Sequence, residues 1–154
     1  MKSKIAVLFV AASFLSQNAF TGAWDIGPFD NDDALDWVYE LEASSDLSAV
    51  EDALSAVANE DSYIEAPTGS AAVAAAEVVA ALLGKPHPQL PPEVVAWTKN
   101  RSLAKDNQLK QLARQVIAGV QDSTKSELAQ LWLESEEIFD EWKSSLSDLE
   151  QRLQ

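Results

Sequence analysis

Apolar residues in this chain recur at the three- and four-residue spacing of α-helices, and most prolines and glycines fall between the periodic segments. Alternation of single apolar and polar residues, the pattern of half-buried β-strands, never persists over the length of a strand. The pattern therefore predicts an all-α fold. We expect a compact bundle of five or six helices that follows an extended N-terminal segment rich in aromatic residues.

The first two helices are predicted in residues 29–44 and from residue 48 onward. In FDNDDALDWVYELEAS, Asp30 or Asn31 can cap the helix, and the acids that follow suit the positive end of its dipole. One face of this helix carries Leu35, Val38 and Leu41. The second helix opens with SAVE, a capping-box sequence, and its predicted inward residues are Val50, Leu54 and Val57.

The segment TGSAAVAAAEVVAALLG, residues 68–84, is apolar on every side except at Glu77. A helix so rich in alanine and without a polar face is expected at the centre of the bundle. Glu77 is then buried and needs a partner, such as a tryptophan indole, Tyr63, a backbone amide or Arg114. A buried carboxyl can also act as a general acid or base, so Glu77 is a candidate for chemistry as well as for structure.

Three more helical segments complete the prediction. PPEVVAWTKN forms a short helix that begins at paired prolines, and residues 103–120 form an amphipathic helix. The inward residues of that amphipathic helix are Leu109, Leu112, Val116, Ile117 and Val120. The last segment opens with a second capping-box sequence, TKSE.

An uninterrupted heptad seam runs through this last segment. Its members are Leu128, Trp132, Ser135, Phe139, Trp142, Leu146, Leu149 and Leu153. Either one long helix docks on the bundle, or the helix breaks at Ser135 and folds back. We expect the seam to pack within the chain rather than to form a dimer.

The N-terminus has the order of a secretory signal, with two lysines followed by a nearly continuous apolar run from Ile5 to Leu15. The run is too short for a stable membrane span, and the sequence after it is a poor cleavage site. We therefore divide the chain into a signal-like segment, residues 1–21, and one helical domain, residues 22–154. Secretion or a periplasmic location is expected, unless the start codon is misassigned and the protein is cytoplasmic.

The net charge of −14 is unevenly distributed. Residues 25–84 hold fourteen acids and no Lys or Arg, whereas residues 85–125 hold seven Lys or Arg and three acids. The two parts can neutralise each other in the fold, or the acidic part can dock a partner with a basic surface. Direct nucleic-acid binding is not expected, because it requires clustered basic residues.

Few enzyme classes fit the residues present. The chain has no cysteine and one histidine, His87, which lies between two prolines and is expected in an exposed loop. DNDDALDWVYEL lacks the central glycine of a calcium loop. We therefore prefer helix capping as the role of its acids over a functional acidic surface or a metal site. We expect no metal and no cofactor. Whether the protein is an enzyme is uncertain, and a protein without catalytic activity is preferred.

The stretch GAWDIGPFDNDDALDW resembles the N-terminal signature of the bacterial DUF4259 family, whose members continue from Gly-Ala-Trp through Gly-Pro-Phe, Asn-Asp-Asp-Ala and Asp-Trp. The similarity continues in SYIEAPTGSAAVAAAEVVAALLGKPHPQLP, at Trp97, and in SELAQLWLESEEIFDEW. It covers residues 22 to about 153. Asp25 replaces the glycine usual after the tryptophan. The resemblance implies no activity, because none is assigned to the family.

The residues that match the family pattern are the candidates for a binding or structural motif. They are Trp24, Phe29, Asn31, Asp32, Asp33, Asp36, Trp37 and Glu77, with Gly22, Gly27 and Pro28 beside them. The leading hypothesis is a non-enzymatic acidic interaction protein, of the immunity or antagonist type. The alternative is a ligand-binding or hydrolase-like site that Glu77 forms with the Asn31–Asp33 motif and the tryptophans. Convergence of these groups on one pocket would favour the alternative.

Overall fold

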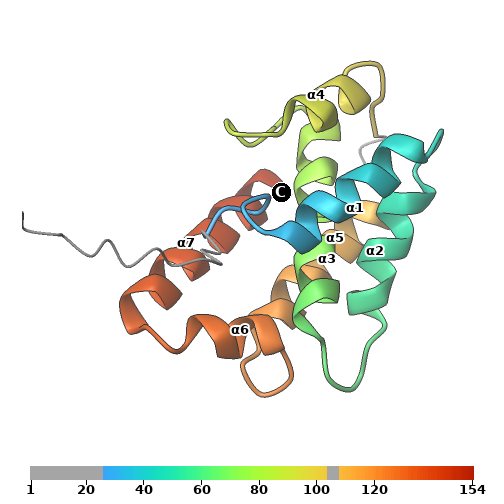
Figure 1. Cartoon of the computed structure of the whole chain (residues 1–154). Coiled ribbons are helices and arrows are strands. Elements are labelled where there is room, and N and C mark those ends of the chain that lie inside the picture. Colours follow the sequence, from blue (N-terminus) through green and yellow to red (C-terminus); the bar gives the residue numbers. More distant parts are fainter. Residues whose placement is uncertain (1–25, 104–107) are drawn as a thin grey trace, which may run out of the picture.

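The computed structural model describes residues 26–103 and 108–154, and these ranges contain seven α-helices and no β-strand (Figure 1). In chain order the helices are α1 (Asp32–Ala43), α2 (Ser48–Ala58), α3 (Ala66–Leu82), α4 (Pro92–Thr98), α5 (Gln108–Val120), α6 (Glu127–Trp132) and α7 (Glu136–Arg152). The all-α prediction is confirmed. The count exceeds five or six because the last predicted segment forms two helices. The signal-like segment lies outside the described residues.

Helix α3 is the central helix, as its composition predicts. Figure 1 shows α3 in the middle of the fold, with α1, α2 and α5 beside it. Most of its residues are buried, including an unbroken run at positions 72–80. Alanine fills most of this run, and its short side chain lets the neighbouring helices lie close. This packing leaves Glu77 no exposed face to occupy.

Both ends of α3 are closed by specific hydrogen bonds. At the N-terminus, the Ala66 amide donates to the Glu127 carboxylate of α6 at 2.7 Å. At the C-terminus, the amides of Gly84 and Lys85 donate to the carbonyls of Ala81 and Ala80, both at 2.9 Å, in a Schellman motif. Gly84 has φ of +83°, which glycine adopts without the penalty that a side chain would bring.

Helix α1 starts as predicted, but it buries a different face. Asn31 is the N-cap, and its side-chain oxygen accepts a hydrogen bond from the Ala34 amide at 2.9 Å. The buried residues are Ala34, Trp37, Val38 and Leu41. Leu35 is 42% exposed, so its predicted place in the core was wrong. Because Ala34 was not counted as a core residue, the predicted stripe was shifted around the helix.

The capping-box interpretation was wrong for both helices to which it was applied. At α2 the side chain of Ser48 caps nothing, and its amide donates instead to the Asp46 carboxylate at 2.9 Å. At α6 the N-cap is Ser126, whose hydroxyl accepts from the Ala129 amide at 3.3 Å. Glu127, expected to complete that box, bonds to α3. The carboxylate therefore joins two helices instead of closing its own.

The heptad seam faces inward, but the helix that carries it is not continuous. Helix α6 ends at Trp132 and α7 begins at Glu136, with Ser135 as its N-cap residue. The two helices meet at a corner, so that α7 returns along the bundle (Figure 1). Leu128, Trp142, Leu146, Leu149 and Leu153 are buried within the chain. The seam packs intramolecularly, as expected, with a break at the predicted position.

Helices α4 and α5 complete the bundle. Helix α4 begins after Pro91 as predicted, and the described part of α5 runs from Gln108 to Val120. Trp97 of α4 donates its indole N–H to the Ser44 carbonyl at 3.1 Å, and the Arg101 guanidinium lies 4.1 Å from the centre of its ring. These contacts attach α4 to the end of α1.

Candidate functional site

A cavity of about 240 Å³ lies where the N-terminal segment meets α3, α6 and α7. We call it the α3–α7 cavity. Its walls are formed by residues 26–28, Asn31, Ser70, Val73, Glu77, His87, Leu128, Trp132, Trp142, residues 144–146 and Asp148. The Asp148 side chain is 62% exposed, so the cavity reaches the protein surface beside it.

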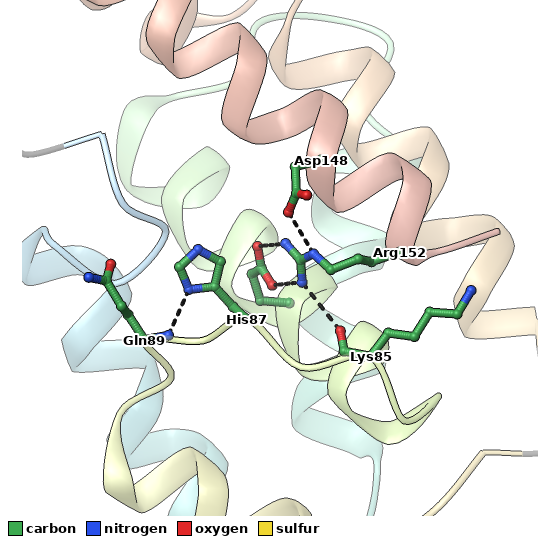
Figure 2. A network of polar contacts seen from close by, with 6 residues as sticks. Lys85, His87, Gln89, Asp148 and Arg152 are labelled. Carbon is green, nitrogen blue, oxygen red and sulfur yellow. Dashed lines mark hydrogen bonds and ion pairs between the residues drawn. The ribbon is translucent and has the colours of Figure 1, made fainter.

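Glu77 is held on the cavity wall by a bidentate ion pair with Arg152 of α7. Nη1 and Nη2 of Arg152 donate to the two carboxylate oxygens of Glu77 at 2.7 and 2.8 Å. Figure 2 shows Arg152 reaching from α7 towards the backbone of Lys85, with Asp148 above it. Its Nε donates to Asp148 at 2.7 Å, and Nη1 also lies 3.4 Å from the Lys85 carbonyl.

The ion pair decides what Glu77 can do chemically. The prediction that Glu77 is buried and hydrogen-bonded is confirmed, and its partner is a basic side chain as considered, but this is Arg152 and not Arg114. Arg114 lies 3.9 Å from Glu150 on the surface, and Tyr63 bonds to Gln130. Because both carboxylate oxygens of Glu77 already accept from a guanidinium, the carboxylate is poorly placed to act as a general base.

The ion pair also shifts the pKa of Arg152. The hydrogen bonds to Glu77 and the negative charge of that carboxylate raise the pKa of Arg152 above its ordinary value, with a smaller contribution from Asp148. A basic group with a raised pKa in the folded state stabilises the fold at every pH below its ordinary pKa. The pair therefore contributes through the whole physiological range.

Two residues that line the cavity each contain a buried polar atom without a hydrogen-bond partner among the described residues: the Ser70 hydroxyl and the indole N–H of Trp132. Ser70 is 2% exposed. A buried polar group without a partner costs about 1 to 3 kcal/mol, and native proteins keep few of them. A shared position on one cavity makes this pair a candidate for ligand contact.

Aromatic rings form one side of the cavity. Trp132 and Trp142 are stacked, with ring centroids 6.4 Å apart and planes inclined by 30°. Phe139 lies 5.8 Å from Trp142 and extends the cluster towards the α6–α7 corner. Both tryptophans belong to the predicted heptad seam. Trp142 is buried in the core, whereas Trp132 is only partly buried, and its indole N–H has no hydrogen-bond partner among the described residues.

His87 lies in the loop between α3 and α4, as predicted, but it is partly buried and lines the cavity. Its Nδ1 accepts a hydrogen bond from the Gln89 amide at 3.1 Å (Figure 2). In a neutral imidazole the proton is then on Nε2, which is left as a donor. His87 thus adds a polar group to the cavity wall. Its position between two prolines in the sequence did not indicate this place.

The residues of the predicted motif are divided by the fold. Asn31 lines the cavity and caps α1, whereas Phe29 and Trp37 are core residues. Trp24 lies outside the described residues. The predicted convergence of Glu77 with the Asn31–Asp33 motif is met by Asn31 alone.

The three remaining members of the motif, Asp32, Asp33 and Asp36, belong to α1 and are not among the cavity residues. Partial burial raises the pKa of Asp33, and repulsion from Asp36 and Asp32 adds to the shift. A carboxyl with a raised pKa opposes folding when it ionises, so this cost is relieved as the pH falls. Asp32 and Asp33 therefore lie in the first turn of α1, Asp36 follows after it, and none of the three forms part of the cavity.

Within residues 26–103 and 108–154, no group of His, Asp and Glu side chains is arranged to hold a metal ion. No helix in the same ranges is long and apolar enough to cross a membrane.

The described residues define an all-helical protein with a small cavity between its central and last helices. The chain belongs to the DUF4259 family, a domain of unknown function, which matches residues 22–145. The resemblance identified from sequence is confirmed. Asp148 and Arg152 lie after the matched residues. No curated protein and no solved structure matches the chain.

Proposed function

We propose that this protein is a non-enzymatic binding protein that takes a small ligand in the α3–α7 cavity. The observation that carries the proposal is that two residues lining this cavity, Ser70 and Trp132, each have a buried polar atom, Oγ and Nε1, without a hydrogen-bond partner among the described residues. Binding sites are concave, largely apolar and equipped with a few polar groups that fix the ligand. A ligand that pairs with both atoms would relieve their desolvation cost.

The same geometry argues against catalysis by the described residues. A serine nucleophile needs an adjacent base within hydrogen-bond reach, and the Ser70 hydroxyl has no partner in the described part of the chain. Glu77, the candidate acid or base, is engaged by Arg152 on both oxygens. Ligand binding without chemistry is the function that these contacts support best.

The proposal is tested by nuclear magnetic resonance of the tryptophan indole N–H groups. Adding a library of small polar fragments to ¹⁵N-labelled protein is expected to shift the Trp132 indole signal, because this donor gains a hydrogen bond. Trp97 is the internal control, because its indole N–H already donates to Ser44 and lies away from the cavity. The Trp132→Phe variant assigns the signal. A library that leaves the Trp132 signal unmoved would contradict the proposal.

A second candidate function is the docking of a basic partner on the acidic surface, in the manner of an immunity or antagonist protein. A groove between α1 and α2 supports it, because alanines form much of its floor and Glu40 and Asp52 lie along it. Both acids are exposed, and no Lys or Arg occurs in residues 25–84 to neutralise them. Such a surface attracts positive charge and sets the rate of association.

Docking at this groove predicts binding that depends on salt. The affinity for a basic protein captured by pull-down from the native cell should fall steeply as salt rises past physiological strength, because exposed charges are screened over about 8 to 10 Å. Glu40→Gln combined with Asp52→Asn should weaken binding, whereas Glu93→Gln on α4 serves as the control. Titration calorimetry at several salt concentrations measures both effects. Binding indifferent to salt would remove this candidate.

A further inference from the structure

We infer that the ligand of the α3–α7 cavity is a small neutral molecule rich in hydroxyl groups, of the size of a single sugar ring. This inference rests on the proposed function and specifies its ligand class. It follows from the hydrogen-bonding types, the charge and the size of the cavity, taken in turn.

The hydrogen-bonding groups on the wall are of opposite kinds. Trp132 Nε1 can only donate, the Glu77 and Asp148 carboxylates can only accept, and the Ser70 hydroxyl can do both. A ligand must therefore present acceptors and donors within a short distance of each other. The hydroxyl group supplies both functions from one atom, so a molecule with several hydroxyls can match this wall in more than one place.

The charges on the wall argue against an ionic ligand. An anion would need an unpaired basic group, but the Arg152 guanidinium is already paired with Glu77 and Asp148. A cation would need a free buried carboxylate, but both oxygens of Glu77 accept from Arg152. Asp148 is largely exposed and also bonds to Arg152, so solvent screens it. A neutral ligand avoids both difficulties.

The size and aromatic lining fit one ring. A volume of about 240 Å³ corresponds to roughly eight water molecules, at about 30 Å³ for each. A six-membered ring with its hydroxyls fills such a space, whereas a disaccharide exceeds it. The Trp132 and Trp142 rings offer apolar surface to the C–H groups of the ring, while the serine, indole and carboxylates address its hydroxyls.

The test uses a matched set of probes on the full chain. Glucose, galactose and mannose are the neutral probes, glucuronate is the anionic one, and protonated glucosamine is the cationic one. At least one neutral hexose should move the Trp132 indole signal in a saturable manner. The affinity of its charged counterparts should be lower by about tenfold or more. Saturable binding that prefers glucuronate or glucosamine would overturn the inference.

Variants of two buried serines separate binding from stability. Ser70→Ala should reduce hexose affinity by about tenfold or more, because it removes a ligand contact. It should leave the melting temperature of the free protein unchanged or raise it, because the hydroxyl has no partner among the described residues. Ser126→Ala, the control, should lower the melting temperature by removing the α6 cap and should leave the affinity intact.

The outcomes also separate this inference from the proposed function. If the hexoses leave Trp132 unmoved while other fragments shift it, the ligand class is wrong and the cavity remains a binding site. If neither set shifts Trp132, both proposals fail. If a hexose binds equally well to Ser70→Ala and to the unchanged protein, the assignment of the cavity wall is overturned.

Discussion

Replacing Arg152 with methionine is expected to lower the free energy of unfolding by about 3 kcal/mol, at the lower end of the range for a broken buried ion pair. The reason is the burial of its partner, Glu77. The Glu77 side chain is 3% exposed, so without the guanidinium its charge stays buried and unpaired. Methionine keeps much of the apolar stem of Arg152, which limits the loss of packing. Chemical denaturation monitored by tryptophan fluorescence measures the change.

Replacing the other member of the ion pair should cost less. In Glu77→Gln the Arg152 side chain keeps its bond to Asp148 and, being 15% exposed, can also turn towards water. We expect a loss of about 1 kcal/mol, the usual value for a hydrogen bond. The double variant should recover part of the Arg152→Met loss, which shows as a coupling energy in a double-mutant cycle. Equal losses for both single variants, with no coupling, would mean that the pair does not stabilise the fold.

Replacing Trp142 with alanine is expected to lower the free energy of unfolding by about 3 to 5 kcal/mol, the range for removing a buried aromatic side chain. Trp142 is 3% exposed and contacts both Trp132 and Phe139. Its loss would leave a void between α6 and α7 that α-helical backbone cannot close. Thermal unfolding followed by circular dichroism measures the effect.

Trp142→Phe is the matched control, because it keeps an aromatic ring at the same position. It should retain more than half of the stability that the alanine variant loses. The Trp132 indole signal should also move in both variants, because the two rings are stacked. If Trp142→Ala were as stable as the unchanged protein, the aromatic cluster would not hold the corner together.

The central helix could be predicted because its evidence is local. Seventeen residues without a polar face can only be buried, and this composition also requires that Glu77 be satisfied inside the protein. The identity of its partner could not be predicted. Arg152 is 75 residues away in sequence, and spacing alone does not distinguish it from Arg114, which lies at the surface. Tertiary packing decides between two such arginines.

The errors at the first helices have a similar cause. The helical spacing is followed better by the buried residues Ala34, Trp37, Val38 and Leu41 than by a stripe through Leu35. Ala34 was overlooked because the prediction relied on large apolar side chains. The sequences SAVE and TKSE were likewise taken as capping boxes, but α2 has no side-chain cap and its Ser48 amide donates to Asp46, whereas α6 is capped by Ser126 in place of Thr124. Short motifs of this kind indicate a helix start within a few residues and do not identify the capping atom.

The cavity could be predicted only in part. Glu77, Asn31, Gly27 and Pro28 were selected from sequence, and the tryptophans were named with Glu77 in the alternative site. Ser70, His87 and Asp148 were not selected, although all of them line the cavity. Ser70 was hidden in an alanine-rich segment, where a single serine is unremarkable. Trp132 was identified as a seam residue, and spacing does not show that its indole N–H has no partner among the described residues.

The hydrogen bonds at the two ends of α3 bear on the order in which the protein folds. The Ala66 amide donates to Glu127 of α6, and the buried charge of Glu77 is paired with Arg152 of α7. Both groups of the central helix are therefore satisfied by residues that come much later in the sequence. Contacts between such distant positions slow folding, because long loops must close before they form. The buried polar groups of the central helix are therefore satisfied only when α6 and α7 dock.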